Sequence, residues 1–316
     1  MKKFDFLKEK TIVDLSNYGV RSHIIENFLL EKSINIIYGP AGLGKTWLLF
    51  AISKFCIEKG YEVVYLDSDN GIDTVKDRQY DLHIKKMGDK MHYINGDILD
   101  SKEEMSQILS DIEKNTVLGY DKSIFILDSL AFFLNNNLYD EAKIDRITSF
   151  AKKIRRAGGT VIFISHSTKD GKSMKGGGSL INALDEVFEA AKNHDEDGIL
   201  QFLLTPSKYR MDVKLSAFVV NTKDLSIESV DASLATIDLN TQAFIDAVLA
   251  ALNVEKLSQN KLLESLGYNK SDKAKIRLLN CYVGKFWSCS IGENRAKIYE
   301  AIETQTTQTT QTTQGN

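Results

Sequence analysis

Short apolar runs alternate with longer amphipathic stretches through the first half of the chain. The runs are rich in β-branched and aromatic side chains, which is typical of strands buried on both faces of a sheet. They fall at residues 34–38, 63–66, 124–127 and 161–164. Because helix-length segments separate them, the pattern predicts an α/β fold built on a mostly parallel sheet.

Two of the separating segments have a clear apolar face at helical spacing. The apolar positions are Trp47, Leu48, Ala51, Ile52 and Phe55 in the first segment and Ile144, Ile147, Ala151 and Ile154 in the second. Gly60 and Gly158 follow these faces, where glycine commonly ends a helix. We therefore expect each helix to stop just before its glycine.

The pattern changes at about residue 198, where apolar runs at 199–204, 217–220 and 225–230 leave no room for helices between them. We expect antiparallel strands that extend the edge of the sheet. Helical periodicity returns at about residue 238. The sequence thus predicts a larger domain at 31–235 and a smaller one at 236–303, with residues 1–30 packing on the larger domain or on a neighbouring copy.

The smaller domain is predicted to contain three helices followed by a β-hairpin. The helices fall at 241–253, 258–266 and 271–284, and the hairpin strands at 286–290 and 295–299. This order has helix-turn-helix spacing and resembles a winged helix. The Thr/Gln repeat at 304–316 has too little apolar content to fold, so we expect a disordered tail without assigned function.

A phosphate-binding loop is the strongest chemical signal in the sequence. It follows the first apolar run, opens the first amphipathic helix and reads Gly39, Pro40, Ala41, Gly42, Leu43, Gly44, Lys45 and Thr46, with Trp47 next. In such a loop the backbone amides surround the phosphates, the lysine neutralises them and the hydroxyl ligates Mg²⁺. The expected ligands are therefore ATP and Mg²⁺, with Lys45 and Thr46 in these roles.

Carboxylates follow two of the other predicted strands. Asp128, followed by Ser129, ends the run at 124–127, where a carboxylate can hold the Mg²⁺ shell; the alternative is a simple cap of the next turn. Asp67 and Asp69 follow the run at 63–66, and either could activate the attacking water. Ordinary turn chemistry is the alternative for this pair, and between them we favour Asp69 as the base.

His166 and Ser165 end the run at 161–164. Ligands bind at the carboxyl ends of strands in open α/β sheets, so a polar side chain here can sense the γ-phosphate or the activated water. A purely structural histidine is the alternative interpretation.

The order of these motifs resembles that of the RecA-like hexameric ATPases, most closely plasmid RepA and the DnaB-type replicative helicases. The resemblance covers about residues 20–230 and includes the Lys- and Gly-rich stretch 165–180 and the later Lys208 and Arg210. It implies a ring of identical subunits in which Lys208 and Arg210 reach the γ-phosphate of the neighbouring subunit. A solvated pair of cations on a hairpin is the alternative for these two residues.

The resemblance has two departures. Family members commonly carry an arginine before the Gly-Ser of the glycine-rich stretch, where this chain has Lys175 and three glycines. The carboxylate after the second strand is usually glutamate in the family and is aspartate here, which bears on the rate of hydrolysis.

The resemblance also implies that residues 168–180 form a pore loop facing single-stranded DNA. Lys169, Lys172 and Lys175 would track its phosphates through salt-sensitive contacts, and a mobile surface loop is the alternative. In the smaller domain, cations gather on the third helix and the hairpin, at Lys273, Lys275, Arg277, Arg295 and Lys297. A winged helix would place these against duplex DNA, or the domain could instead contact a replication protein.

Bulk composition adds three expectations. A net charge of −3 over 316 residues does not exclude DNA binding, because local charge decides it. Three cysteines without C-x-x-C spacing, at 56, 281 and 289, argue against a disulfide framework or a zinc module, so buried thiols are expected. With no long apolar run or leader pattern, the sequence predicts a cytoplasmic protein without a membrane partner.

The favoured function is an ATP-dependent, ring-forming helicase or translocase of a replication system, moving on single-stranded DNA. A RecA-like recombination or repair ATPase is one alternative. The other is an ATP-gated winged-helix regulator that binds duplex DNA and hydrolyses ATP slowly.

Overall fold

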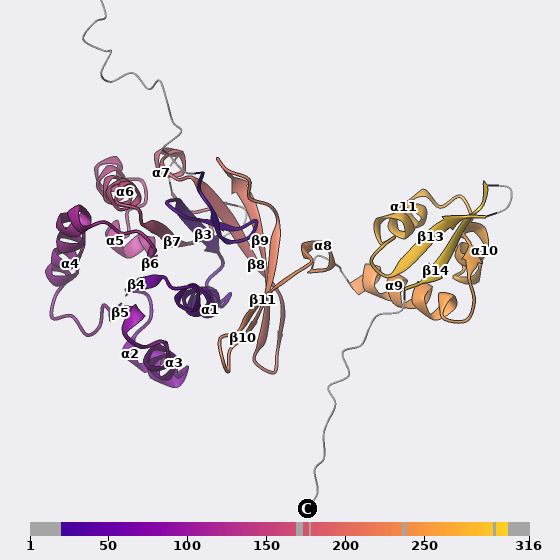
Figure 1. The fold of residues 1–316 in the computed structure, drawn as a ribbon, viewed down its shortest axis with the longest axis horizontal. Helices are drawn as coiled ribbons and strands as arrows, with labels where there is room; N and C mark the ends of the chain where they lie inside the picture. Colours follow the sequence, from indigo (N-terminus) through magenta and orange to yellow (C-terminus); the bar gives the residue numbers. More distant parts are fainter. Residues whose placement is uncertain are drawn as a thin grey trace, which may run out of the picture. The chain divides into compact units, whose positions relative to one another are not determined.

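The computed structural model describes residues 20–168, 173–176, 178–235, 237, 239–292 and 295–302. The chain divides into two compact units, Met1–Thr236 and Ile237–Asn316. Each unit has its own buried core and is described by itself (Figure 1). Within the described residues, no helix combines the length and apolarity needed to cross a membrane.

A nine-stranded sheet forms the centre of the first unit. In chain order its strands are β3 (Ile34–Gly39), β4 (Glu62–Asp67), β5 (Met91–Asn95), β6 (Ser123–Asp128), β7 (Thr160–His166), β8 (Glu186–Glu196), β9 (Ile199–Lys208), β10 (Ser216–Asn221) and β11 (Ile227–Val230). In space they run β11-β10-β9-β8-β3-β7-β6-β4-β5. The six strands from β5 to β8 are mutually parallel, and β9, β10 and β11 extend the edge antiparallel. The predicted sheet class is therefore confirmed.

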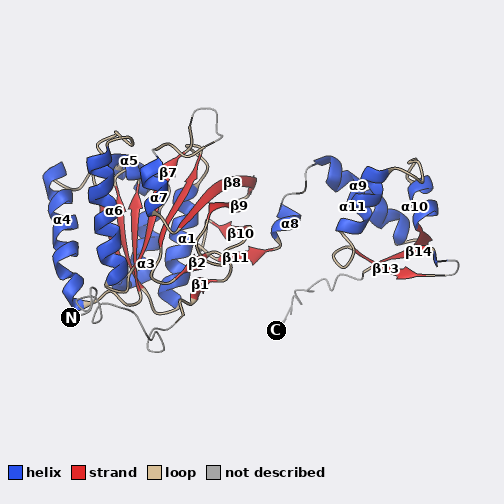
Figure 2. Ribbon diagram, turned by 90° about the horizontal axis from the view of Figure 1, so that it is seen from above, coloured by secondary structure: helices blue, strands red, loops and turns tan. Residues whose placement is uncertain are grey.

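Helices cover both faces of this sheet (Figure 2). They are α1 (Lys45–Glu58), α2 (Ile72–Asp77), α3 (Tyr80–Met87), α4 (Lys102–Lys114), α5 (Leu130–Phe133), α6 (Glu141–Arg156), α7 (Gly178–Ala183) and α8 (Ala232–Ala235), with 3₁₀ turns η2 (Gly88–Lys90) and η3 (Asn115–Leu118). Helices α1 and α3 bury side chains in one core, and α4 to α7 bury theirs in the other. The sheet thus lies between two apolar layers.

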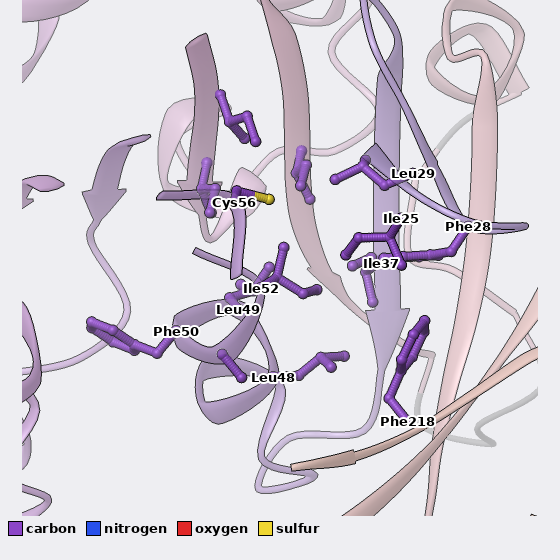
Figure 3. Packing of buried hydrophobic residues seen from close by; sticks show 14 of the residues in the cluster. Ile25, Phe28, Leu29, Ile37, Leu48, Leu49, Phe50, Ile52, Cys56 and Phe218 are labelled. Atoms are coloured by element: carbon purple, nitrogen blue, oxygen red, sulfur yellow. The ribbon is translucent and has the colours of Figure 1, made fainter. Parts of the chain in front are cut away.

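The core beneath α1 explains why the first amphipathic segment folds as predicted. Leu48, Leu49 and Ile52 of α1 are fully buried and pack with Ile37 of β3 (Figure 3). A short hairpin, β1 (His23–Ile25) with β2 (Leu29–Leu30), adds Phe28, whose ring lies 4.8 Å from Phe188 and 5.4 Å from Phe218. Residues 23–30 therefore belong to the core of the first unit.

The predicted helix ends are confirmed at both glycines. Gly60 and Gly158 have φ of 91° and 101°, a left-handed conformation that costs other residues more than glycine. The Gly60 amide donates to the Ile57 carbonyl at 2.9 Å, and the Gly158 amide donates to Arg155 at 3.1 Å. Each chain reversal returns the backbone to the sheet at the next strand.

Two strands were missed by the sequence pattern. Strand β5 mixes polar and apolar residues, and its apolar content is too low for a run to stand out. Strand β8 begins as an apolar alternation but ends in the polar sequence Lys192–Glu196, beyond the part that pairs with β3. Only the first half of β8 is buried, and Val187 and Phe188 there are 2% and 0% exposed.

The second unit contains three helices and a three-stranded antiparallel sheet. Its elements are α9 (Leu239–Leu252), β12 (Leu257–Ser258), α10 (Gln259–Ser265), α11 (Lys273–Cys281), β13 (Trp287–Ile291) and β14 (Lys297–Ala301). The sheet order is β12-β14-β13. Trp287 is fully buried at the centre and donates from Nε1 to the Leu279 carbonyl at 2.9 Å, which ties the hairpin to α11.

The expectation for the cysteines holds only in part. Cys56 is buried in the core beneath α1, whereas Cys281 is exposed and Cys289 is partly buried. The expectation was wrong for Cys281 because this residue ends α11 on the surface of the second unit.

Candidate nucleotide site

The phosphate-binding loop connects the carboxyl end of β3 to the first turn of α1. Gly44 precedes the helix with φ of 94°, a conformation that side-chain-bearing residues rarely adopt. At Gly39 a Cβ atom would come 2.7 Å from the Ala190 carbonyl oxygen, so glycine is required for β8 to pass this close. The loop geometry therefore depends on the glycines that the motif predicts.

Lys45 lies inside the loop, only 7% exposed. Its Nζ donates to the carbonyls of Gly39 at 3.0 Å and Pro40 at 2.8 Å. Burial lowers the pKa of Lys45, and the nearby charges of Asp128 and Asp69 partly oppose this shift. The amine is thus held at the mouth of the loop, where it can approach a phosphate without leaving its carbonyl partners.

Asp128 ends β6 beside β4, at the same edge of the sheet. Its side chain is 2% exposed, and the Tyr65 hydroxyl donates to its Oδ2 at 2.8 Å. Burial, together with the charges of Asp67 and Asp69, raises the pKa of Asp128 to about 7. A dication would relieve this repulsion, so the carboxylate suits the expected Mg²⁺ role.

Asp67 and Asp69 have different environments although two positions separate them. Asp67 is fully buried and accepts from the Asp69 and Asn70 amides at 3.0 Å each. Its other oxygen accepts from the Asn70 side-chain amide at 2.9 Å and the Tyr93 hydroxyl at 2.7 Å. Asp67 therefore organises the turn that carries Asp69.

Asp69 is half-exposed and faces the end of β7. Its Oδ2 lies 3.8 Å from His166 Nε2, and its Oδ1 accepts from Ser129 Oγ at 3.5 Å. The close approach of His166 holds the pKa of Asp69 below its usual range, and burial works against this effect. The opposite ring nitrogen of His166, Nδ1, lies 3.5 Å from Lys45 Nζ. His166 thus bridges the candidate base and the loop lysine.

Strand order explains this convergence. Strand β7 lies between β3 and β6, so His166 ends its strand between the phosphate-binding loop and Asp128. The residues fit a nucleoside triphosphate with Mg²⁺: Thr46 is the second residue of α1, and Asp128 is the last residue of β6. Within the described part of the chain, no three His, Cys, Asp or Glu side chains could hold a metal by themselves.

Lys208 and Arg210 lie near the opposite ends of the parallel strands, where β3 and β8 begin. Lys208 Nζ donates to the carbonyls of Ile181 in α7 and of Leu184 just after this helix. Arg210 donates to Asp185 Oδ1 at 3.2 Å and to the Asn182 carbonyl at 2.8 Å. Asp185 caps the start of β3, accepting from the Ile34 amide at 3.0 Å.

The Asp185 carboxylate is the centre of a cationic cluster that sequence reasoning missed. Arg155 Nη1 lies 2.9 and 3.0 Å from its two oxygens, and Arg21 Nη1 lies 3.8 Å away. Arg155 and Arg21 lie 30 or more residues from Asp185 in the sequence, so no local spacing of residues predicts the cluster. Tyr65 and Tyr93 were missed for the same reason, because each reaches a carboxylate on or beside a neighbouring strand.

The residues predicted to contact DNA differ in their exposure, and two of them lie outside the described part of the chain. Lys169 and Lys172 lie outside the described residues, whereas Lys175 is exposed and its amide donates to the His166 carbonyl at 3.1 Å. Of the cations predicted to contact DNA in the second unit, Lys273, Arg277, Arg295 and Lys297 are exposed. Lys275 instead lies over the rings of Phe244 and Tyr268, at 4.9 and 4.7 Å from their centroids.

Residues 18–172 match the family model described as an AAA domain. This match supports a P-loop ATPase domain in the first unit. The match spans β3 to β7, which include every strand that supplies a residue to the nucleotide site.

Short similarities connect this chain to replication initiators. A 99-residue stretch is 36% identical to the chromosomal replication initiator protein DnaA of Campylobacter jejuni subsp. jejuni serotype O:6, covering 30% of this chain and 22% of the relative. The DnaA of Campylobacter jejuni subsp. doylei is 35% identical over 99 residues, with the same coverage. That of serotype O:23/36 is 36% identical over 84 residues, covering 26% of this chain and 19% of the relative. The chain thus spans about a fifth of the length of these relatives.

Proposed function

We propose that this protein is a DNA-dependent ATPase of a replication system that forms a ring and moves along single-stranded DNA as a helicase or translocase. One observation carries the proposal. The candidate hydrolytic groups gather at one edge of the sheet, and the Lys208 and Arg210 pair lies at the other. Such a division supports hydrolysis shared between neighbouring copies.

The chemistry follows from the residues of one copy. The loop amides and Lys45 bind the β- and γ-phosphates, and Asp69 accepts the proton of the attacking water. Mg²⁺, when bound, neutralises phosphate charge, and Thr46 and Asp128 are the residues that would hold it. His166 contacts both Lys45 and Asp69, so it is suited to report loss of the γ-phosphate to the following loop, which begins at Ser167.

The distance along β3 argues that Arg210 acts on a neighbour. Asp185, which holds Arg210, binds the amide of Ile34 at the start of this strand, whereas the phosphate-binding loop begins at its end. The five-residue step corresponds to roughly 16 Å. Arg210 is therefore too far from the nucleotide of its own chain, and a head-to-tail contact between copies would bring it to the next site. Such contacts close into rings when the rotation allows.

The second unit supports a DNA-binding role. A first helix, a short strand, two further helices and a hairpin, with the short strand paired to the last one, are the parts of a winged helix. Lys273 and Arg277 are exposed on α11, the helix that would enter a major groove. Contact with a replication protein is the other use of such a surface.

A second candidate function is favoured by the relatives, which are named as replication initiators. In that case ATP controls the assembly of a duplex-binding protein, and turnover is slow. The two functions share the nucleotide site and differ in their response to DNA.

Steady-state ATP hydrolysis with and without single-stranded DNA, followed by a forked-duplex unwinding assay, tests the proposal. We expect stimulation by single-stranded DNA together with unwinding, and loss of both in Lys45→Ala. Stimulation without unwinding would favour a recombination or repair ATPase. Slow hydrolysis that ignores DNA, with tight duplex binding, would favour the initiator-like switch.

Arg277 and Lys275 form a matched pair for testing the second unit. Arg277→Ala should weaken duplex binding and reduce its salt dependence by about one unit of log–log slope, because an exposed cation is lost. Lys275→Ala removes a cation that packs on aromatic rings, so it should lower thermal stability and leave the salt slope nearly unchanged. Equal DNA affinity in all three proteins would leave the domain as a protein-contact module.

A further inference from the structure

The two buried carboxylates of the nucleotide site have different supports. Asp67 accepts four hydrogen bonds, two of them from backbone amides. Asp128 has one hydrogen-bond donor to its side chain among the described residues, the hydroxyl of Tyr65 at 2.8 Å from Oδ2. The orientation of the Asp128 carboxylate thus depends on a single side chain.

Tyr65 is itself fixed by aromatic packing. It is fully buried, and its ring stacks on Phe50 with centroids 5.3 Å apart and planes 21° apart. Phe50 belongs to α1, the helix that begins with Lys45 and Thr46. Tyr93 of β5 adds a third ring, 5.5 Å from Tyr65. The cluster therefore connects the helix after the phosphate-binding loop to the strand end that carries Asp128.

The Tyr65 hydroxyl is the donor in its contact with Asp128, at 2.8 Å from Oδ2. Burial, followed by the charges of Asp128 and Asp67, raises the pKa of Tyr65 well above its ordinary value. Since the proton points to Oδ2, the second oxygen of Asp128, Oδ1, is left for other ligands.

We propose that Tyr65 is a positioning residue that orients the Asp128 carboxylate, occupying Oδ2 so that Oδ1 serves the Mg²⁺ shell. This inference rests on the proposed nucleotide function. A supporting partner that fixes a metal-ligating carboxylate affects metal affinity more than it affects the chemistry of the ligand itself.

Two neighbouring tyrosines provide controls within the same cluster. Tyr93 donates to Asp67 instead, so its hydroxyl supports the turn that carries Asp69. Tyr80 is fully buried and stacks on Phe50 at 4.6 Å, and its hydroxyl accepts from Arg78 rather than contacting a carboxylate. Replacing each by phenylalanine removes one oxygen from the same aromatic layer.

The test is a Mg²⁺ titration of a fluorescent ATP analogue bound to the full chain. Tyr65→Phe should raise the Mg²⁺ concentration for half-maximal nucleotide binding by about 10-fold, within the range found when supports of metal ligands are removed. Affinity for the analogue without Mg²⁺ should stay unchanged. Tyr80→Phe should titrate like the unmodified protein, and Tyr93→Phe should lower turnover with little change in the Mg²⁺ midpoint.

A double-variant cycle separates positioning from general damage to the site. In an Asp128→Asn background, Tyr65→Phe should cause no further rise in the Mg²⁺ midpoint, because the group it orients no longer carries charge. A wild-type Mg²⁺ midpoint for Tyr65→Phe would overturn the assignment, as would an equal shift for Tyr80→Phe. If the unmodified chain binds the analogue without any Mg²⁺ dependence, the proposed nucleotide function fails as well.

Discussion

The two ends of the parallel strands carry opposite arrangements of charge. We call them the carboxyl edge, where β3, β4, β6 and β7 end, and the amino edge, where β3 and β8 begin. At the carboxyl edge, one buried lysine, Lys45, faces the carboxylates Asp128 and Asp69. At the amino edge, the buried carboxylate of Asp185 is surrounded by Arg21, Arg155 and Arg210, next to the equally buried Glu186. The first edge has too few cations for its carboxylates, and the second has more cations than Asp185 needs.

This difference suggests what each edge is for. Asp185 is satisfied by Arg155 and the Ile34 amide, so Arg210 adds a further partner while remaining half-exposed. Arg210 also donates to the Asn182 carbonyl at 2.8 Å, and a half-exposed cation with such contacts can leave a satisfied carboxylate at low cost. At the carboxyl edge, the developing negative charge of phosphoryl transfer would be stabilised by such a cation. Head-to-tail contact between copies would bring the two edges together.

The largest effect is expected from Arg210→Ala. If Arg210 stabilises the transition state in a neighbouring site, hydrolysis should fall by about 10³-fold while nucleotide affinity stays within about 2-fold. Steady-state turnover and analogue binding measure the two quantities separately. Mixing Arg210→Ala with Lys45→Ala should restore activity, since one variant keeps the loop and the other keeps the arginine.

Arg155→Ala is the matched control, because it removes a partner of the same carboxylate. This variant should lose thermal stability, and its folded fraction should hydrolyse ATP far faster than Arg210→Ala does. Equal losses in the two variants would mean that Arg210 only supports the fold around Asp185. Failure of the mixed oligomers to recover activity would exclude action between subunits.

The sequence predicts the carboxyl edge well, because each of its groups follows a recognisable strand. The glycines and Lys45 form a contiguous motif, and Asp128 and His166 directly follow apolar runs that become β6 and β7. Strand order then brings them together, as parallel strands do at their common edge. The same pattern also predicts the sheet class.

The amino edge could not be predicted in this way. Asp185 forms ion pairs with Arg155 on α6 and with Arg210 after β9, and no pattern in the local sequence links these three residues. Tyr65 and Tyr93, which donate to Asp128 and Asp67, could not be predicted either, because a tyrosine within a strand is ordinarily a core residue. Likewise, Lys275 looks like a DNA contact by charge alone, whereas its aromatic partners lie on α9 and beyond α10.

A smaller effect is expected at Glu186, the residue next to Asp185. Its side chain is fully buried, and neither carboxylate oxygen has a hydrogen-bond partner among the described residues. Burial, followed by the Asp185 charge, raises the pKa of Glu186 to about 7, from an ordinary value of 4.5. Between these two pH values the unfolded chain releases this proton and the folded chain keeps it. Folding stability from this group therefore falls as pH rises from about 4.5 to 7, and stays level above that.

Glu186→Gln removes this pH-dependent loss of folding stability, because glutamine has a similar shape and keeps a hydrogen-bond donor but does not titrate. The variant should match the unmodified protein at pH 4.5 and exceed it at pH 8 by on the order of 2 kcal/mol in the free energy of unfolding. Denaturant unfolding at both pH values measures the difference. Asp128 titrates in both proteins and cancels from the comparison.

Glu228→Gln on β11 is the control, since Glu228 is exposed and its removal should change neither value. A Glu186→Gln variant less stable than the unmodified protein at pH 8 would mean that the ionised carboxylate is needed. In that case Glu186 would share with Asp185 the task of holding Arg21, Arg155 and Arg210. The cations of the amino edge would then be balanced within the chain, and the charge argument for contact with a neighbour's carboxyl edge would lose its basis.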